Sequence, residues 1–193
     1  NGEGEAVHLF TRDCSLQRKY QKIVEEAPAL NIDNQKLEEI QNLSVEACKK
    51  LNYEGAGTIE FLYENNDFYF IEMNTRIQVE HPITEMIFDV DLVKNQILSH
   101  SGVDLSTQIK NVQPKGHSIE CRITAEDPDK NFMPSPGVVE SLHFPGGLGV
   151  RIDSHIYSGY KIPSNYDSMI AKIITYAETR DECIMKMRAA LSE

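Results

Sequence analysis

The spacing of apolar residues along this chain predicts helices and strands in separate stretches. After Asp33, which can serve as a helix N-cap, one apolar face would be formed by Leu37, Ile40, Ala47, Cys48 and Leu51. This helix is expected to carry Lys49 and Lys50 in its last turn and to end before Gly55. A second helix is predicted over Asp91–His100.

Runs of β-branched and aromatic residues predict the strands. Residues Gly57–Glu64 and Phe68–Asn74 flank the turn sequence Asn65-Asn66-Asp67 and are expected to form a hairpin. Ala6–Phe10 would form another strand, with a partner upstream. His117–Glu126 alternates with a period of two, and the prolines and glycines that follow punctuate short strands typical of a small antiparallel sheet.

Both ends of the chain are expected to fall inside structural elements. Asn1–Glu5 is predicted as a hairpin turn, and the helical spacing within Thr179–Ser192 meets no glycine stop. Residues 103–115 show little periodicity and contain Pro114, so they are expected to connect two units. The sequence therefore predicts two domains, over residues 1–110 and 111–193.

Charge and composition exclude several classes of function. The 193 residues carry a formal net charge of -11 and a pI near 5.0, which disfavours binding to nucleic acid or to an anionic membrane. The four cysteines are dispersed and form no CxxC pair, which is typical of thiols in a reducing cytosol. No apolar run is long enough for a membrane span, and the polar start Asn1–Glu5 does not read as a signal peptide, so a soluble, cytoplasmic protein is expected. No histidine spacing matches a zinc site.

A row of polar side chains follows the predicted hairpin. Every even position from Glu72 to Glu80 is polar or charged: Glu72, Asn74, Arg76, Gln78 and Glu80. Fully extended, this row would cover about 26 Å, which is too long to surround one reaction centre, so a bend is expected. His81-Pro82 is predicted to end the strand.

Glu60 joins this row if the hairpin loop has three residues, because Glu60 then opposes Glu72. A two-residue loop without a bulge would place them on different faces. Two opposed carboxylates repel, and a bridging cation would relieve that repulsion. Magnesium prefers oxygen ligands, so Glu60, Glu72 and Asn74 are the candidate metal ligands. The alternative is an ordinary solvated face of a half-buried strand.

Two further sites of positive charge are candidates for anion binding. The stretch from Gln17 to Lys22 is the most basic in the chain and could either contact phosphate or form a self-paired surface edge. Arg122 lies on the polar side of its strand, where an ion pair with a glutamate such as Glu120 is the alternative to a functional role.

Five segments together identify a family. RDCSLQRKYQKIVEEAP, GAGTIEFLYENNDFYFIEMNTRIQVEHPITE, GHSIECRITAEDP, PSPG and YDSMIAK resemble the biotin carboxylase family in order and over essentially the whole chain. The similarity is greatest to the subunits found in bacterial acetyl-CoA carboxylase. It implies an α+β chain: the second half of an ATP-grasp domain followed by the β-rich biotin carboxylase C-terminal domain, without the N-terminal domain and glycine-rich lid.

The resemblance also implies roles for individual residues. Glu60, Glu72 and Asn74 would hold Mg²⁺ or Mn²⁺, while Gln17 and Lys22 would face nucleotide and bicarbonate. The residues implied for the reacting anions are Arg76, Gln78 and the backbone of Val79 for bicarbonate, Glu80 as its base, and Arg122 for biotin. Tyr20 departs from the histidine that many members carry near the nucleotide ribose.

The implied activity is ATP-dependent carboxylation of biotin by bicarbonate, the first half-reaction of acetyl-CoA carboxylase in fatty acid synthesis. Its implied partners are a biotin carboxyl carrier protein, carboxyltransferase subunits and a second copy of the full-length chain. Alternatives are the biotin carboxylase part of pyruvate or propionyl-CoA carboxylase, another ATP-grasp ligase such as a carboxylate-amine ligase or one of the carbamoyl-phosphate synthetase type, or a noncatalytic module of the same fold. The chain by itself is expected to be inactive.

Overall fold

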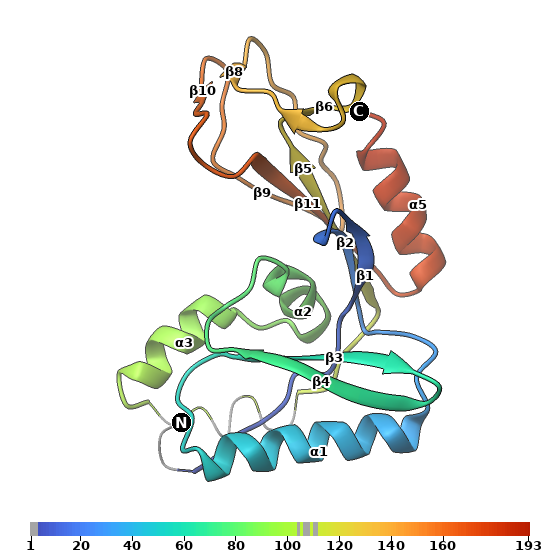
Figure 1. Ribbon diagram of the computed structural model, residues 1–193, viewed down its shortest axis with the longest axis vertical. Helices are drawn as coiled ribbons and strands as arrows, with labels where there is room; N and C mark the ends of the chain where they lie inside the picture. The colour runs from blue at the N-terminus through green and yellow to red at the C-terminus, as the bar shows by residue number, and fades with distance from the viewer. Residues whose placement is uncertain (1–3, 104, 106–108, 110–111) are drawn as a thin grey trace. The chain divides into compact units, whose positions relative to one another are not determined.

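The structure is a computed structural model, and it describes residues 4–103, 105, 109 and 112–193. The chain forms two compact units (Figure 1). Unit 1 consists of Asn1–Asp13 and Pro28–Lys115, and unit 2 consists of Cys14–Ala27 and Gly116–Glu193. The domain boundary after residue 110 stays a prediction, but the units themselves are not continuous in sequence.

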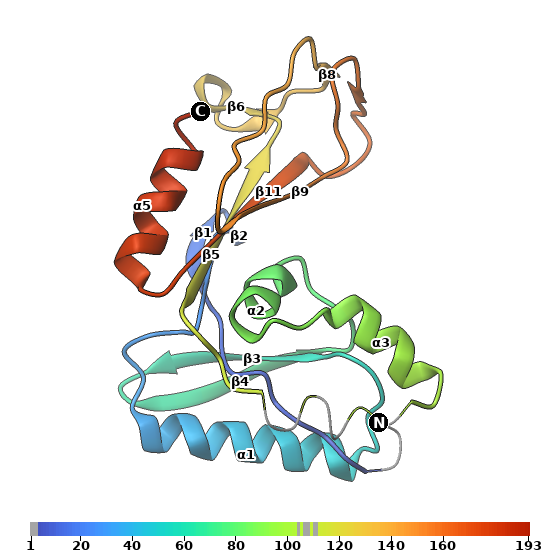
Figure 2. The same ribbon diagram turned by 180° about the vertical axis from the view of Figure 1, so that it is seen from behind.

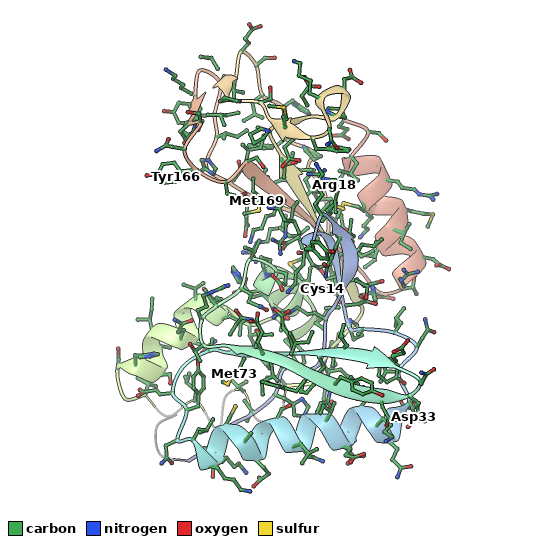
Figure 3. All side chains as sticks on the ribbon, viewed as in Figure 1. Cys14, Arg18, Asp33, Met73, Tyr166 and Met169 are labelled. Carbon is green, nitrogen blue, oxygen red and sulfur yellow. The ribbon has the colours of Figure 1, made fainter. Side chains whose placement is uncertain are left out.

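Unit 1 contains the predicted helix, α1 (Asn34–Lys50). The side chain of Asp33 accepts hydrogen bonds from the backbone N–H groups of Gln35 and Lys36, at 3.0 Å each, which satisfies two of the donors that a helix start leaves open. Figure 3 shows Asp33 at this end of α1. The helix is tied to a hairpin by Lys36, whose ammonium lies 3.0 Å from Asp67.

That hairpin consists of β3 (Thr58–Glu64) and β4 (Asp67–Asn74), as predicted. Its loop has two residues rather than three, since Glu64 pairs directly with Asp67. Asn65 and Asn66 both have positive φ angles, 52° and 65°, as a type I′ turn requires, and asparagine tolerates this region better than most residues. Of the two loop lengths considered, the structure therefore has the shorter one.

Two helices follow the hairpin. The predicted helix over 91–100 is confirmed as α3 (Leu92–His100), with Asp91 as its N-cap. The other, α2 (His81–Phe88), was not predicted, because His81-Pro82 was interpreted only as a strand terminator. Proline fits the first turn of a helix, where its missing N–H would have no partner. Six of the eight residues of α2 are buried, so it forms the core of this unit.

The predicted strand over residues 6–10 was wrong. The structure has no strand between residues 4 and 12, and Phe10 has a φ of 55°, which an extended strand cannot include. The first strand begins instead at Asp13. The predicted turn over residues 1–5 and the connection over 103–115 lie partly outside the described residues.

Unit 2 is built on a five-stranded sheet in the order β1-β2-β5-β11-β9. Its strands are β1 (Asp13–Arg18), β2 (Gln21–Ala27), β5 (His117–Thr124), β11 (Met169–Ala177) and β9 (Val150–Ser154). Strand β5 pairs antiparallel with both β2 and β11, and β11 pairs antiparallel with β9. The predicted antiparallel region is confirmed, but two of its strands come from the first thirty residues of the chain.

Short elements and one helix complete unit 2. Two-stranded pairs are formed by β6 (Glu126–Asp127) with β7 (Met133–Pro134), and by β8 (Gly137–Val138) with β10 (Lys161–Ile162). A 3₁₀ turn, η1, spans Pro128–Lys130. Helix α5 (Arg180–Ala190), the third predicted helix, runs beside the sheet (Figure 2).

The core of unit 2 lies between α5 and one face of the sheet. It contains Ile119 and Cys121 from β5, Ile173 and Ala177 from β11, and Cys183, Met187 and Ala190 from α5. Burial raises the pKa of the Cys121 thiol to about 11, which keeps it protonated and unreactive. Among the described residues, no helix is long and apolar enough to cross a membrane.

Candidate active site

A bulge in the hairpin of unit 1 brings two carboxylates face to face. Counting back from the two-residue loop, regular pairing would place Ile71 opposite Glu60. The register instead shifts between Glu60 and Phe61, so that Ile71 is skipped and Glu60 opposes Glu72. The predicted opposition of the two glutamates is therefore present, but the bulge and not the loop length produces it.

Neutral amide groups hold these carboxylates. The side-chain amide of Asn74 donates to Glu60 at 3.2 Å and to Glu72 at 3.0 Å. The amide of Gln78 donates to the same oxygen of Glu60 at 2.6 Å, and Arg12 in turn donates to the Gln78 carbonyl oxygen at 2.7 Å. We refer to Glu60, Glu72 and Asn74 as the acidic cluster.

The donor set of the acidic cluster fits a hard divalent cation. It offers two carboxylates, and rotation of the Asn74 amide would exchange its N–H donors for an oxygen. Among the described residues, no group of three His, Cys, Asp or Glu side chains is arranged to hold a metal ion. With only two charged ligands, the cluster suits a cation such as Mg²⁺ that takes further oxygens from water or phosphate.

The chain bends after the hairpin, as the length of the polar row predicted. Strand β4 ends at Asn74, and the residues up to Glu80 form no strand. Gln78 and Glu80 are buried, whereas Arg76 is exposed and donates to the backbone carbonyl of Ile77 at 3.2 Å. Glu80 occupies the N-cap position of α2, although its side chain makes no capping hydrogen bond to that helix.

The basic stretch lies on the β1–β2 hairpin of unit 2. Gln17 is on β1 and its amide donates to the Cys14 carbonyl at 3.0 Å, while Lys22 is on β2. Tyr20, in the turn, is 98% exposed. Figure 3 shows Cys14 and Arg18 on this hairpin.

Contacts of the turn explain how the hairpin is fixed within unit 2. Arg18 forms an ion pair with Glu126 and stacks on the ring of Phe132, with 4.0 Å to the centroid. Lys19 donates to the Asn131 carbonyl at 2.9 Å. These two cations are therefore held by residues 126–132 and not by Glu25 or Glu26.

Arg122 also lies in unit 2, and its ion-pair partner is Glu25 on the neighbouring strand β2. The Arg122 guanidinium donates to Glu25 Oε1 from Nε at 2.6 Å and from Nη2 at 2.5 Å. The glutamate expected in this role, Glu120, opposes Glu25 across the β2–β5 pair. Glu25 was missed because the pair joins residues 97 positions apart.

The candidate residues thus fall into two sets. Unit 1 carries Glu60, Glu72, Asn74, Arg76, Gln78, Val79 and Glu80, of which Glu60, Glu72, Asn74 and Gln78 are joined by hydrogen bonds. Unit 2 carries Gln17, Lys22 and Arg122.

Comparison with known proteins shows which family this chain belongs to. The family model for the carbamoyl-phosphate synthase L chain ATP binding domain matches residues 1–108, and that for the biotin carboxylase C-terminal domain matches residues 120–193. The chain belongs to the biotin carboxylase family. It corresponds to the C-terminal half of that family's members, an ATP-grasp second half followed by the C-terminal domain.

Individual relatives support this assignment. Biotin carboxylase of Pseudomonas aeruginosa is 57% identical over 193 residues, which are 100% of this chain and 43% of the relative. A pyruvate carboxylase subunit from Methanothermobacter thermautotrophicus is 52% identical, over 98% of this chain and 39% of the relative. The chain therefore spans about two fifths of the length of these proteins.

A solved structure gives the same result. The biotin carboxylase domain dimer of Hydrogenobacter thermophilus 2-oxoglutarate carboxylase, in complex with MgADP, ADP and bicarbonate, has a TM-score of 0.94. It is 47% identical in sequence, and the match covers 98% of this chain and 42% of that one.

Proposed function

We propose that this chain supplies the metal, bicarbonate and biotin contacts of an enzyme that carboxylates biotin with ATP and bicarbonate. The observation that carries the proposal is the acidic cluster, in which a bulge places Glu60 opposite Glu72 beside Asn74. These three residues would hold Mg²⁺ or Mn²⁺, which neutralises charge on the phosphates of ATP when bound. Gln17 and Lys22 would contact the nucleotide and bicarbonate.

In the proposed first step, Glu80 removes the proton of bicarbonate. Arg76, Gln78 and the backbone N–H of Val79 hold the anion while an oxygen of the resulting dianion attacks the γ-phosphorus of ATP, which forms carboxyphosphate and releases ADP. Burial of Glu80 and Gln78 supports this assignment, because a water-excluded site strengthens each electrostatic contact.

In the proposed second step, carboxyphosphate breaks down to CO₂ and phosphate. The phosphate takes the proton from the biotin ureido nitrogen, and that nitrogen then bonds to CO₂. Negative charge develops on the ureido oxygen during this step, and Arg122 is the donor proposed to stabilise it.

The acyl acceptor that finally receives the carboxyl group is proposed to be acetyl-CoA, as in the first steps of fatty acid synthesis. Four relatives named biotin carboxylase share 55–59% identity with this chain, against 52% for the pyruvate carboxylase relative and 48% for the 2-oxoglutarate carboxylase relative, while two others named biotin carboxylase share 50% and 48%. A biotin carboxyl carrier protein, carboxyltransferase subunits and a homodimer of the full-length protein complete the proposed assembly.

The decisive experiment separates the two steps. In the full-length protein, meaning the complete gene product that carries this chain, Glu80→Gln should lower bicarbonate-dependent phosphate release by about 10² to 10⁴. Arg122→Gln should leave slow phosphate release while carboxybiotin formation falls much further. If Arg122→Gln lowers both products equally, or neither, the biotin role of Arg122 is wrong.

The chain of 193 residues alone is proposed to lack this activity, because its relatives are more than twice as long. Turnover by the isolated chain comparable to that of the full-length protein would contradict this proposal.

A further inference from the structure

Two consecutive glutamates on β2 serve opposite faces of the unit 2 sheet. Successive side chains of a strand point to opposite sides, so Glu25 and Glu26 cannot share a face. Glu26 lies on the face covered by α5, where it accepts a hydrogen bond from His117 at 2.8 Å and two from Arg180 at 2.7 and 3.1 Å. Glu25 lies on the other face and pairs with Arg122.

The sheet places charges in a defined order on the Glu25 face. Lys172 of β11 opposes Arg122 of β5, so two cations stand side by side and repel each other. Asp153 of β9 lies 3.5 Å from the Lys172 ammonium, and Glu25 of β2 lies 2.5 Å from the Arg122 guanidinium. Arg122 is therefore attracted towards β2 and Lys172 towards β9, so the two cations are drawn apart.

The Glu25 contact fixes the orientation of the Arg122 guanidinium and not only its charge. Both donated hydrogen bonds come from the Nε/Nη2 edge of the group and converge on one oxygen of a side chain that is 0% exposed. A guanidinium has five N–H donors in a rigid plane, so fixing one edge sets the direction of the other three. The Arg122 side chain is 18% exposed, which leaves part of it accessible to a ligand.

We infer that Glu25 is a positioning residue for biotin carboxylation: it fixes the Arg122 guanidinium so that the remaining donors face the ureido oxygen of biotin. The inference rests on the function proposed for Arg122. A long, flexible side chain must otherwise be ordered when charge develops, and a misplacement of about 1 Å can reduce rate by about 10²-fold. Glu25 accomplishes this ordering before the substrate arrives.

The test compares four single variants and one double variant of the full-length protein. Glu25→Gln keeps the size of the side chain and removes its charge. Glu25→Asp keeps the charge, but the side chain is one methylene shorter, which moves the carboxylate away from Arg122. Glu26→Gln is the matched control, because it removes the charge of the adjacent glutamate on the opposite face. Arg122→Gln and the double variant Glu25→Gln/Arg122→Gln complete the set. Phosphate release, formation of carboxybiotin from free biotin, and the midpoint of thermal unfolding are measured for each.

We expect Glu25→Gln to lower the ratio of carboxybiotin to released phosphate by about tenfold, with a rise in KM for biotin, and Glu25→Asp to lower it less. Glu26→Gln should lower the unfolding midpoint and keep the ratio. The double variant should have the ratio of Arg122→Gln alone, because both changes act through one guanidinium.

Each contrary outcome has its own meaning. Suppose that Arg122→Gln lowers the ratio of carboxybiotin to released phosphate, whereas Glu25→Gln and Glu25→Asp leave this ratio unchanged. Glu25 is then a structural ion-pair partner only, and the inference is wrong. If Glu25→Gln does not fold, an unchanged ratio in Glu25→Asp has the same meaning. If Arg122→Gln itself leaves the ratio of carboxybiotin to released phosphate unchanged, the proposed function of Arg122 is wrong, and the positioning role of Glu25 is wrong with it.

Discussion

The carboxylates of the acidic cluster in unit 1 and those of the ion pairs in unit 2 have different neighbours. Glu60 and Glu72 oppose each other on a hairpin, and the donors identified beside them are the neutral amides of Asn74 and Gln78. In unit 2, Glu25, Glu26 and Glu126 each accept from an arginine of the chain. The first arrangement brings two carboxylates together, which suits an added cation, whereas in the second each carboxylate meets an arginine and the pair stabilises the fold.

Among the variants that test this comparison, the largest effect is expected for Glu72→Gln, which tests its first half. In the full-length protein, the Mg²⁺ concentration needed for half-maximal ATP cleavage should rise about tenfold or more, because a charged ligand of a hard cation is lost. The unfolding midpoint in the absence of metal should stay the same or rise, since repulsion from Glu60 is relieved. An unchanged Mg²⁺ titration would reject the metal site.

The second expected effect is on stability. Glu26→Gln removes the negative charge that accepts from both His117 and Arg180, and should lower the free energy of unfolding by about 1.5–3 kcal/mol, the usual range for hydrogen bonds to charged groups. Thermal unfolding of the full-length protein, followed by circular dichroism, measures this change. A midpoint as high as that of the unmodified protein would show that the pair does not stabilise unit 2.

A fall in pH should also remove the stabilisation that Glu26 provides. The hydrogen bond from His117 lowers the pKa of Glu26 most, and Arg180 lowers it further, so that it falls from 4.5 to about 2. A lowered pKa in the folded state means that the stabilisation is fully present above pH 4.5 and is lost as the pH falls from 4.5 towards 2. The difference in unfolding midpoint between the unmodified protein and Glu26→Gln should therefore shrink across this window. A difference that does not change with pH would contradict the assignment.

The smallest effect is expected at an exposed pair of unit 1. Lys36 and Asp67 lie 3.0 Å apart, but their side chains are 38% and 57% exposed. Solvent screens such a pair, so Lys36→Met should leave the unfolding midpoint unchanged within error. Arg180→Met is the comparison in unit 2: Arg180 is 44% exposed, much like Lys36, but its partner Glu26 is only 19% exposed, so this variant should lower the midpoint. If the two variants are equally destabilised, distance and not burial determines the value of these pairs.

Local signals in the sequence predicted most of the elements. Asp33 and the apolar spacing after it located α1, and the row from Glu72 to Glu80 predicted both a polar face and a bend. The errors arose where two local interpretations compete. Asn65-Asn66-Asp67 permits loops of two or three residues, and Pro82 can end a strand or occupy the first turn of a helix.

Long-range pairing was the part that the sequence could not provide. Glu25 and Arg122 meet because β2 lies beside β5, and no periodicity within either strand indicates that neighbour. The same holds for Arg18 and Glu126, which are 108 positions apart. The bulge at Ile71 is also a property of the paired strands, since it compensates a loop whose length alone would place Glu60 on the wrong face.

The discontinuity of the two units restricts how this protein can be divided for experiments. The backbone passes from one unit to the other after Asp13, after Ala27 and after Lys115. A fragment that starts at Gly116 would lack β1 and β2, which would expose an edge of β5 and leave Arg122 without Glu25. Unit 2 could be produced alone only by joining residues 14–27 to residues 116–193 through a designed linker, because a single cut at any of the three crossings leaves at least one unit incomplete.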